Sequence, residues 1–166
     1  MSFTVAPAGV AELTEGEPHA VAAENARRKA LAIPGELVLG ADTLVTVDGA
    51  ILGKPRDAAQ AAEYVGRLAG RTHAVVGGIA LASGGAIVAE AVEETEVTFR
   101  ALDAAEIAAY VALGEWRGRA GGYAIQGRGA VLVRRVAGEY LNVVGLPLAR
   151  LLDLLAEVVP HRNLQA

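Results

Sequence analysis

The sequence feature that most restricts the fold is a pair of long apolar-rich segments separated by Gly84-Gly85. Residues 72–82 and 86–100 are rich in Ala and Val, and two adjacent glycines between such segments are typical of a tight turn. The pattern predicts two long antiparallel strands joined by a short connection. A sheet is therefore expected at the centre of the fold.

Shorter segments complete the predicted sheet. Residues 36–40 form a short apolar run, which is typical of a buried strand. Residues 44–47 and 50–52 flank Asp48-Gly49, a pair that suits the type I′ turn of a hairpin. Further strands are predicted at residues 3–7 and 130–136 and within residues 138–145.

Four segments carry helix signals. Pro18 suits the first turn of a helix, Asp57 is a suitable N-cap, and Asp103 with Glu106 forms a capping-box pattern. The helices are predicted over residues 18–31, 57–68, 103–113 and 147–158. Residues 118–129 hold five glycines and are predicted as a loop.

The mixture of helices, hairpins and potential crossovers predicts an α/β or α+β fold, with a mixed sheet and flanking helices. At 166 residues the chain has the length of one domain and can bury a sizeable core. No repeat, low-complexity segment or long linker marks a boundary, so one domain over residues 1–166 is expected.

Composition excludes several classes of protein. Hydrophobic residues make up 53% and charged residues 20%, which indicates a globular chain. No apolar run approaches the roughly 20 residues that span a bilayer, and the first residues do not resemble a secretory signal. The absence of cysteine excludes disulfides, thiolate catalysis and zinc–thiolate sites. A cytoplasmic protein without a membrane partner is therefore expected.

The net charge of −4 argues against binding to nucleic acid through its phosphates. A small anionic ligand remains compatible, since one pocket needs only a few cations. The three histidines, His19, His73 and His161, have no metal-ligand spacing and are not predicted to be catalytic.

Lysine is scarce in this chain. Of 15 basic residues only Lys29 and Lys54 are lysines, and the other 13 are arginines. A coding bias that replaced lysine wherever arginine would serve explains the excess. The two remaining lysines are then candidate site residues, because lysine offers a compact charge where arginine offers a planar fork.

Asp42 is the strongest candidate for a catalytic carboxylate. It follows the apolar run of residues 36–40, and site residues of α/β sheets lie at the ends of strands. A carboxylate there could hold a divalent metal or accept a proton from water. A turn aspartate or a helix N-cap is the alternative interpretation.

Two more segments could belong to a site. Lys54 precedes Pro55, which keeps the segment extended, so the lysine could return towards Asp42; a solvated loop lysine is the alternative. The glycine-rich segment around Gln126 could let backbone N–H groups approach a ligand, with the amide suited to the edge of a nucleobase. A plain surface loop is the alternative there.

Taken together, these segments resemble the Maf family, whose members hydrolyse nucleoside triphosphates to the monophosphate and pyrophosphate. The resemblance covers nearly the whole chain. It rests on six segments in order: residues 24–30 (ENARRKA), 39–45 (LGADTLV), 52–57 (LGKPRD), 68–73 (LAGRTH), 120–130 (AGGYAIQGRGA) and 142–148 (NVVGLPL). Each motif is weak alone, and their order and spacing make the resemblance specific.

The resemblance implies an elongated, twisted two-lobed fold with a central cleft, a divalent metal (Mg²⁺ or Mn²⁺) and a homodimer. Asp42 resembles the catalytic proton acceptor and a metal ligand, and Glu12 a second, less secure metal ligand. The implied substrate-binding residues are Lys29, Lys54, Thr43, Gln126, Arg119 and Arg128. At the positions of Thr43 and Gln126 the chain resembles the branch of the family that prefers dTTP and UTP.

Family members usually begin with a strand, a Ser-x-Ser-Pro-x-Arg segment and a helix that have no counterpart here. Three interpretations are open: a natural protein that is longer than this chain, a shortened enzyme, or a non-catalytic nucleotide-binding or regulatory protein on the same scaffold. Release of pyrophosphate from a nucleoside triphosphate separates the last from the other two.

Overall fold

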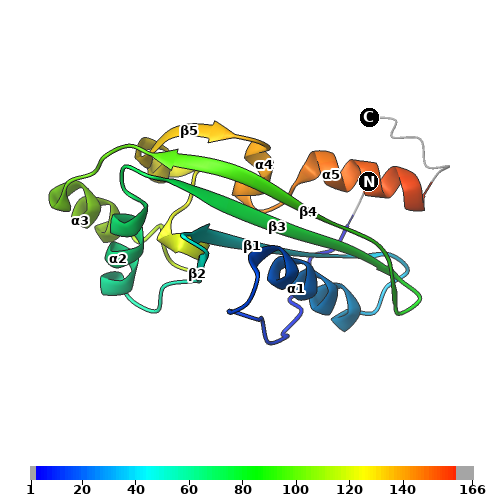
Figure 1. The fold of residues 1–166 in the computed structure, drawn as a ribbon. Helices are drawn as coiled ribbons and strands as arrows, with labels where there is room; N and C mark the ends of the chain where they lie inside the picture. Colours follow the sequence, from blue (N-terminus) through cyan, green and yellow to red (C-terminus); the bar gives the residue numbers. More distant parts are fainter. Residues whose placement is uncertain (1–2, 160–166) are drawn as a thin grey trace.

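The computed structural model describes residues 3–159 and is built on one five-stranded sheet of order β2-β1-β3-β4-β5 (Figure 1). The strands are β1 (Val38–Val47), β2 (Ala50–Leu52), β3 (Thr72–Ser83), β4 (Ala86–Phe99) and β5 (Val133–Ala137). The helices are α1 (Pro18–Ala32), α2 (Ala58–Leu68), α3 (Ala104–Ala112), α4 (Tyr140–Val144) and α5 (Leu148–Val158). Two short 3₁₀ segments, η1 (Ala120–Gly122) and η2 (Gly127–Leu132), precede β5.

Both predicted hairpins are confirmed. Strands β3 and β4 pair along almost their whole length, with one register shift between Leu81 and Ala82. Strands β1 and β2 are joined through Asp48 and Gly49, whose φ angles of 53° and 74° are both positive. Positive φ at both central residues is what a type I′ turn requires.

The α/β class with flanking helices is confirmed, but the sheet differs from the expected mixed one. All four strand pairs among the described residues are antiparallel. The physical reason is the connectivity: hairpin turns reverse the chain between β1 and β2 and between β3 and β4. The α2 connection then returns β3 beside β1 in the opposite direction.

The predicted helix signals agree with the structure. Asp57 caps α2 by accepting from the Gln60 N–H, and Asp103 and Glu106 form the capping box of α3. Glu17 caps α1 by accepting from two backbone N–H groups of the first turn. Caps of this kind satisfy the N–H groups that a helix start leaves unpaired.

Two predicted strands are wrong. Residues 3–7 have no regular structure, and Val5 is 81% exposed, because an apolar segment without a partner strand has no ladder to join. Residues 138–145 contain α4 instead of a strand. Gly145, with φ 133°, closes that helix through its N–H bonds to Leu141 and Asn142. His161 lies outside the described residues.

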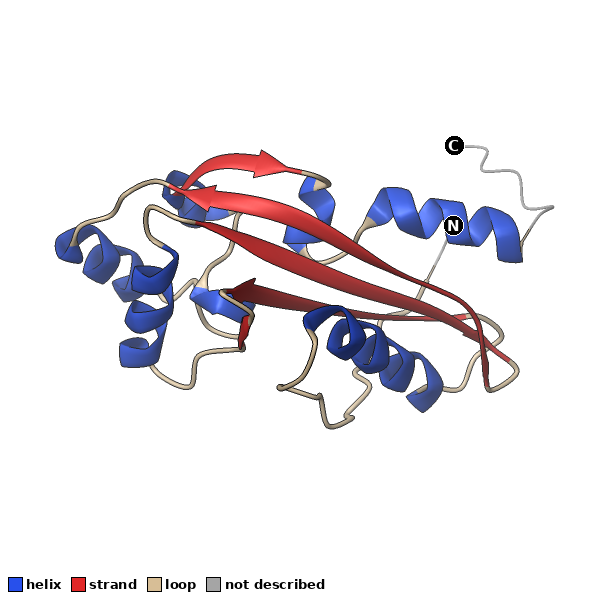
Figure 2. Cartoon of the chain, viewed as in Figure 1, coloured by secondary structure: helices blue, strands red, loops and turns tan. Residues whose placement is uncertain are grey.

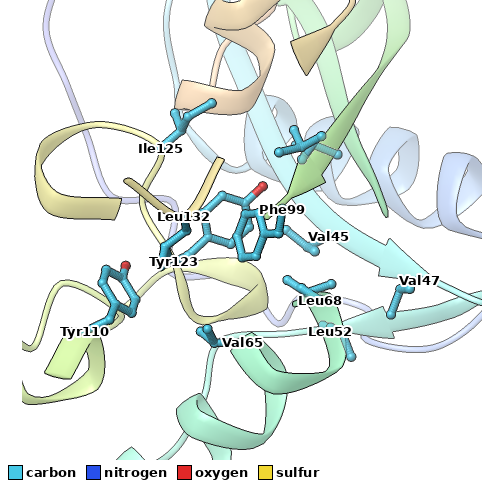
Figure 3. Packing of buried hydrophobic residues seen from close by; sticks show 12 residues of the cluster. Val45, Val47, Leu52, Val65, Leu68, Phe99, Tyr110, Tyr123, Ile125 and Leu132 are labelled. Carbon is cyan, nitrogen blue, oxygen red and sulfur yellow. The ribbon is translucent and has the colours of Figure 1, made fainter. Parts of the chain in front are cut away.

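Helices α2 and α3 lie at one end of the long β3–β4 hairpin, α1 and α5 lie towards the other, and α4 lies between, which agrees with the expected elongated, two-lobed fold (Figures 1 and 2). At one end α2, α3 and the 3₁₀ segments surround the largest apolar cluster, which includes Val45, Phe99 and Tyr123 (Figure 3). At the other end α1 packs beside residues 76, 80 and 82 of β3, and α5 packs against Ile79 and Leu81.

Helix α1 lies unusually close to the sheet. A β-carbon added to Gly40 would lie 2.1 Å from the Ala26 carbonyl oxygen, and one added to Gly78 would lie 2.2 Å from that of Ala22. Ala22 and Ala26 are fully buried, so small residues on the helix meet glycines on two adjacent strands. Because of this close contact, Asn25 and Lys29 of α1 can reach the Asp42 side chain of β1. In residues 3–159, no helix has both the length and the apolar character that crossing a membrane requires.

Candidate active site

Asp42 lies within β1 and not, as expected, in a turn beyond the end of a strand. It pairs with Gly78 of β3, and the ladder continues on both sides of this pair. The side chain points to the α1 face and is 7% exposed. The strand continues past an acidic residue because α1 provides polar partners for the carboxylate.

Both carboxylate oxygens of Asp42 have partners on α1. The Lys29 ammonium donates to Oδ1 at 2.6 Å, and the Asn25 amide donates to Oδ2 at 2.9 Å. Asn25 and Lys29 are four residues apart, so they share one face of the helix. Lys29 and Asp42, two expected site residues, thus form a direct ion pair, whereas Lys54, which was expected to return towards Asp42, is paired with Glu12.

Glu12 joins the same cluster of charges. Its Oε1 lies 2.8 Å from the Lys29 ammonium, and its Oε2 accepts from Lys54 at 3.0 Å. Burial opposes ionisation of Glu12, but hydrogen bonds from the two lysines outweigh it and hold the pKa below its ordinary value. Burial lowers the pKa of Lys29, whereas its bonds to Asp42 and Glu12 raise it above the ordinary value overall.

Lys29, Asp42 and Lys54 border a cavity of about 240 Å³ beside β1, whereas Glu12 does not line it. Its charged lining side chains are Lys29, Asp42, Lys54 and Arg119. Thr43 lines the same cavity, and its hydroxyl donates to the Gly145 carbonyl at 3.4 Å. Four expected substrate-binding residues, from β1, α1 and two loops, are therefore brought to one cavity.

A second cavity of about 290 Å³ adjoins the first and shares Arg119, Tyr123 and the α4 valines with it. Gln126 lines this second cavity and not the first. The Glu115 carboxylate accepts from the backbone N–H groups of Arg128 and Gly129 and so fastens the loop that carries Gln126. The Arg128 side chain is exposed and lines neither cavity.

Several lining residues were not singled out by the sequence. Val143 and Val144 line both cavities, and Tyr123 forms part of the wall between them. The Tyr123 hydroxyl is hydrogen-bonded to His73 Nε2 at 2.8 Å, and burial raises the pKa of Tyr123 far above its ordinary value. Asn25 also had no assigned role, since an amide in a helical pattern gives no sign of its partner.

The acidic groups fit a divalent metal that shares its ligands with a substrate. The Asp42 and Glu12 carboxylates both contact the Lys29 ammonium, so they face one common position, which that ammonium occupies. Residues 3–159 contain no cluster of three or more His, Cys, Asp or Glu side chains that could hold a metal alone. Mg²⁺ is commonly held by one or two carboxylates together with water and phosphate oxygens, so this donor set is suitable.

Fold and cavity together define a class. This is an antiparallel α/β protein with a buried carboxylate beside three cationic side chains, in an open cavity. Such a site suits a polyanionic ligand, because cations offset its charge while the carboxylate can act on water or a metal.

Comparison with known proteins gives the family. A profile described as Maf-like protein matches residues 1–158. The dTTP/UTP pyrophosphatase of Symbiobacterium thermophilum is 46% identical over 161 residues, covering 89% of this chain and 82% of the relative. That of Pyrococcus furiosus is 43% identical over 157 residues, covering 91% and 82%. A nucleoside triphosphate pyrophosphatase of Xylella fastidiosa is 48% identical over 119 residues, covering 72% and 63%. The chain belongs to the Maf-like protein family.

Proposed function

We propose that this chain hydrolyses nucleoside triphosphates, with dTTP and UTP preferred, to the monophosphate and pyrophosphate. The observation that carries the proposal is the buried Asp42 carboxylate at the floor of a cavity lined by Lys29, Lys54 and Arg119. Two relatives that are 43–46% identical to this chain are dTTP/UTP pyrophosphatases, which supports the same activity.

Asp42 is the proposed general base. A water molecule must attack the α-phosphorus while pyrophosphate leaves, and the carboxylate at the cavity wall accepts the proton of that water. Asn25 and Lys29 hold the carboxylate from the helix side, so it cannot turn freely away from the cavity. Its orientation is thus set before substrate arrives, which lowers the cost of reaching the reactive arrangement.

The cationic side chains bind the triphosphate. Lys29 and Lys54 both contact Glu12 in this structure, and Arg119 stands at the junction of the two cavities. The phosphates replace the Glu12 carboxylate as partner of Lys54, which binds the triphosphate in the ground state, and Lys29 then offsets the charge that moves to the leaving pyrophosphate. Arg119 can bind phosphate oxygens in a bidentate manner.

A divalent metal completes the proposed site. Asp42 and Glu12 would hold it, and it would supply charge neutralisation for the pyrophosphate leaving group. Release of Glu12 from Lys54 makes that carboxylate available at the same moment. Glu12 and Lys54 therefore exchange partners as substrate enters.

The nucleobase is proposed to enter the second cavity. Gln126 offers a donor and an acceptor there, and the valines of α4 supply an apolar wall for the flat ring. Thr43 is placed nearer the phosphates than the base, because it lines only the first cavity. A missing methyl on the base is discriminated by about 1–3 kcal/mol, so dTTP and UTP would both be accepted.

The proposal is tested by pyrophosphate release from dTTP and UTP with Mg²⁺. The Asp42→Asn variant keeps the shape of the side chain and is expected to lose at least about 100-fold in kcat, as for a removed general base. Near-parental turnover by Asp42→Asn would refute the role of Asp42. Binding of dTTP without any pyrophosphate release by the parent would favour a non-catalytic nucleotide-binding protein.

A homodimer and a cytoplasmic location stay predictions. Light scattering of the purified chain during gel filtration measures the first directly, and the mass of a monomer would contradict it.

A further inference from the structure

Asn25 is a buried amide whose hydrogen-bonding groups are all used. It is 1% exposed and lies on the α1 face that meets β1. Its Oδ1 accepts from the Leu13 N–H at 2.7 Å, and its Nδ2 donates to the Leu13 carbonyl at 3.0 Å. The other Nδ2 proton goes to Asp42 Oδ2 at 2.9 Å. Burial of an amide is costly unless it is satisfied in this way.

The two bonds to Leu13 fasten an otherwise irregular segment. Residues 3–14 have no helix or strand, and the residue before Leu13 is Glu12. The Glu12 carboxylate reaches both lysines of the site, so its position depends on where the chain at Leu13 is held. Asn25 therefore acts on Glu12 through the backbone of the neighbouring residue.

The bond to Asp42 acts on the second carboxylate directly. Lys29 already contacts Asp42 Oδ1, and Asn25 contacts the other oxygen, so the plane of the carboxylate is set by two groups on one helix. With Lys29 as its only partner, the Asp42 carboxylate could still rotate about its bond to the β-carbon. The neutral amide removes that freedom without adding charge to a site that must accept a polyanion.

We propose that Asn25 is a positioning residue for hydrolysis: one amide sets the Asp42 carboxylate directly and the Glu12 carboxylate through Leu13, so that both meet at the Lys29 ammonium beside the cavity. This inference rests on the proposed function for its kinetic consequence. A merely structural role would require only that Asn25 join α1 to residue 13, and would leave turnover per folded molecule unchanged.

Two substitutions separate the bonds. Asn25→Asp keeps the shape and an acceptor for the Leu13 N–H, but it removes both donors and places a carboxylate against Asp42. Asn25→Ala removes all three bonds. The matched control is Leu154→Ala on α5, which removes buried apolar packing from a cluster that does not include Leu13, at a residue that lines neither cavity.

The first readout is steady-state hydrolysis of dTTP with Mg²⁺, corrected for the folded fraction of each variant. Both Asn25 variants are expected to lose about 10–100-fold in kcat with KM changed by less than about threefold, as when the hydrogen-bond partner of a reactive group is removed. Leu154→Ala is expected to unfold at lower urea with kcat near the parent. Equal kcat for the parent and both Asn25 variants, or an equal fall in the control, overturns the proposal.

The second readout does not depend on activity. Amide hydrogen exchange at Leu13 should accelerate in Asn25→Ala and stay slow in Asn25→Asp, which retains the acceptor. A crystal structure of Asn25→Ala should show Asp42 Oδ2 turned from its present position. An unmoved Asp42 overturns the proposal. If the parent releases no pyrophosphate, the proposed function fails, and these structural readouts still decide whether Asn25 sets Asp42.

Discussion

The buried histidine of β3 should make the stability of this protein depend on pH. His73 is 3% exposed and packs edge-on against Phe99 and Tyr123, with ring centroids 5.0 and 5.4 Å away. Its Nε2 is bonded to the Tyr123 hydroxyl, whereas Nδ1 is buried without a partner. Burial lowers the pKa of His73 from 6.5 to about 4. The imidazole is therefore neutral in the folded protein at neutral pH.

The sign follows from proton binding. Below about pH 6.5 the unfolded chain binds a proton on His73, and the folded chain binds none until the pH nears its pKa of about 4. Stability is therefore lost as the pH falls through this window. At 1.4 kcal/mol per pKa unit, the loss is about 2 kcal/mol at pH 5 and approaches about 3 kcal/mol at and below pH 4. The carboxylates whose pKa is lowered in the folded protein reduce the free energy of unfolding further only below about pH 4.5.

Urea unfolding at pH 7, 6 and 5 measures the effect, and the buried indole of Trp116 gives the fluorescence signal. His73→Phe leaves the Tyr123 hydroxyl without its partner, so it should lower stability at pH 7 by about 1–3 kcal/mol. Its free energy of unfolding should then be flat between pH 7 and 5. The matched control His19→Gln removes a half-exposed histidine and should keep the parental loss. A parent without the loss, or a loss retained by His73→Phe, refutes the reasoning.

Two further predictions concern the site. Gly78→Ala puts a methyl within 2.2 Å of the Ala22 carbonyl, so α1 must shift; we expect a loss of about 1–3 kcal/mol in urea unfolding and a lower kcat, although residue 78 contacts no substrate. A kcat per folded molecule equal to the parent would contradict this. Lys54→Met removes a half-exposed cation of the cavity, and we expect the KM for dTTP to rise about tenfold with little change in kcat, because a ground-state contact is lost. An unchanged KM would mean that Lys54 does not contact the phosphates.

Local signals predicted the parts of the fold that local physics determines. The two glycine turns and the caps at Asp57 and Asp103 lie where the sequence places them, because turns and helix starts depend on adjacent residues. Residues 138–145 were misread because an apolar pair of valines suits a strand. In the structure the Asn142 amide lies on one face of β3 and β4, where it donates to the Val75 and Glu93 carbonyls, and the surrounding chain forms α4.

The sequence predicted which residues belong to the candidate site, but not which of them contact one another. Scarcity of lysine and a carboxylate after an apolar run indicated Lys29, Lys54 and Asp42, and these line one cavity. The second partner of Asp42, Asn25, lies 17 residues earlier in the chain and was not predicted. No local pattern reports a contact that two elements make only once the helix has packed on the sheet. The same limit hid the contact of Glu12 with both lysines.

The close approach of α1 to the sheet has a consequence for recognising this site in other chains. The spacing between the lysine and the aspartate depends on Gly40 and Gly78, residues without any functional group, and each has no room for even one methyl. A chain could keep every charged residue of the cavity and still be inactive if either glycine were replaced. The charged residues alone are therefore an incomplete sequence signature of this site. Gly40 and Gly78 must be included in it as well.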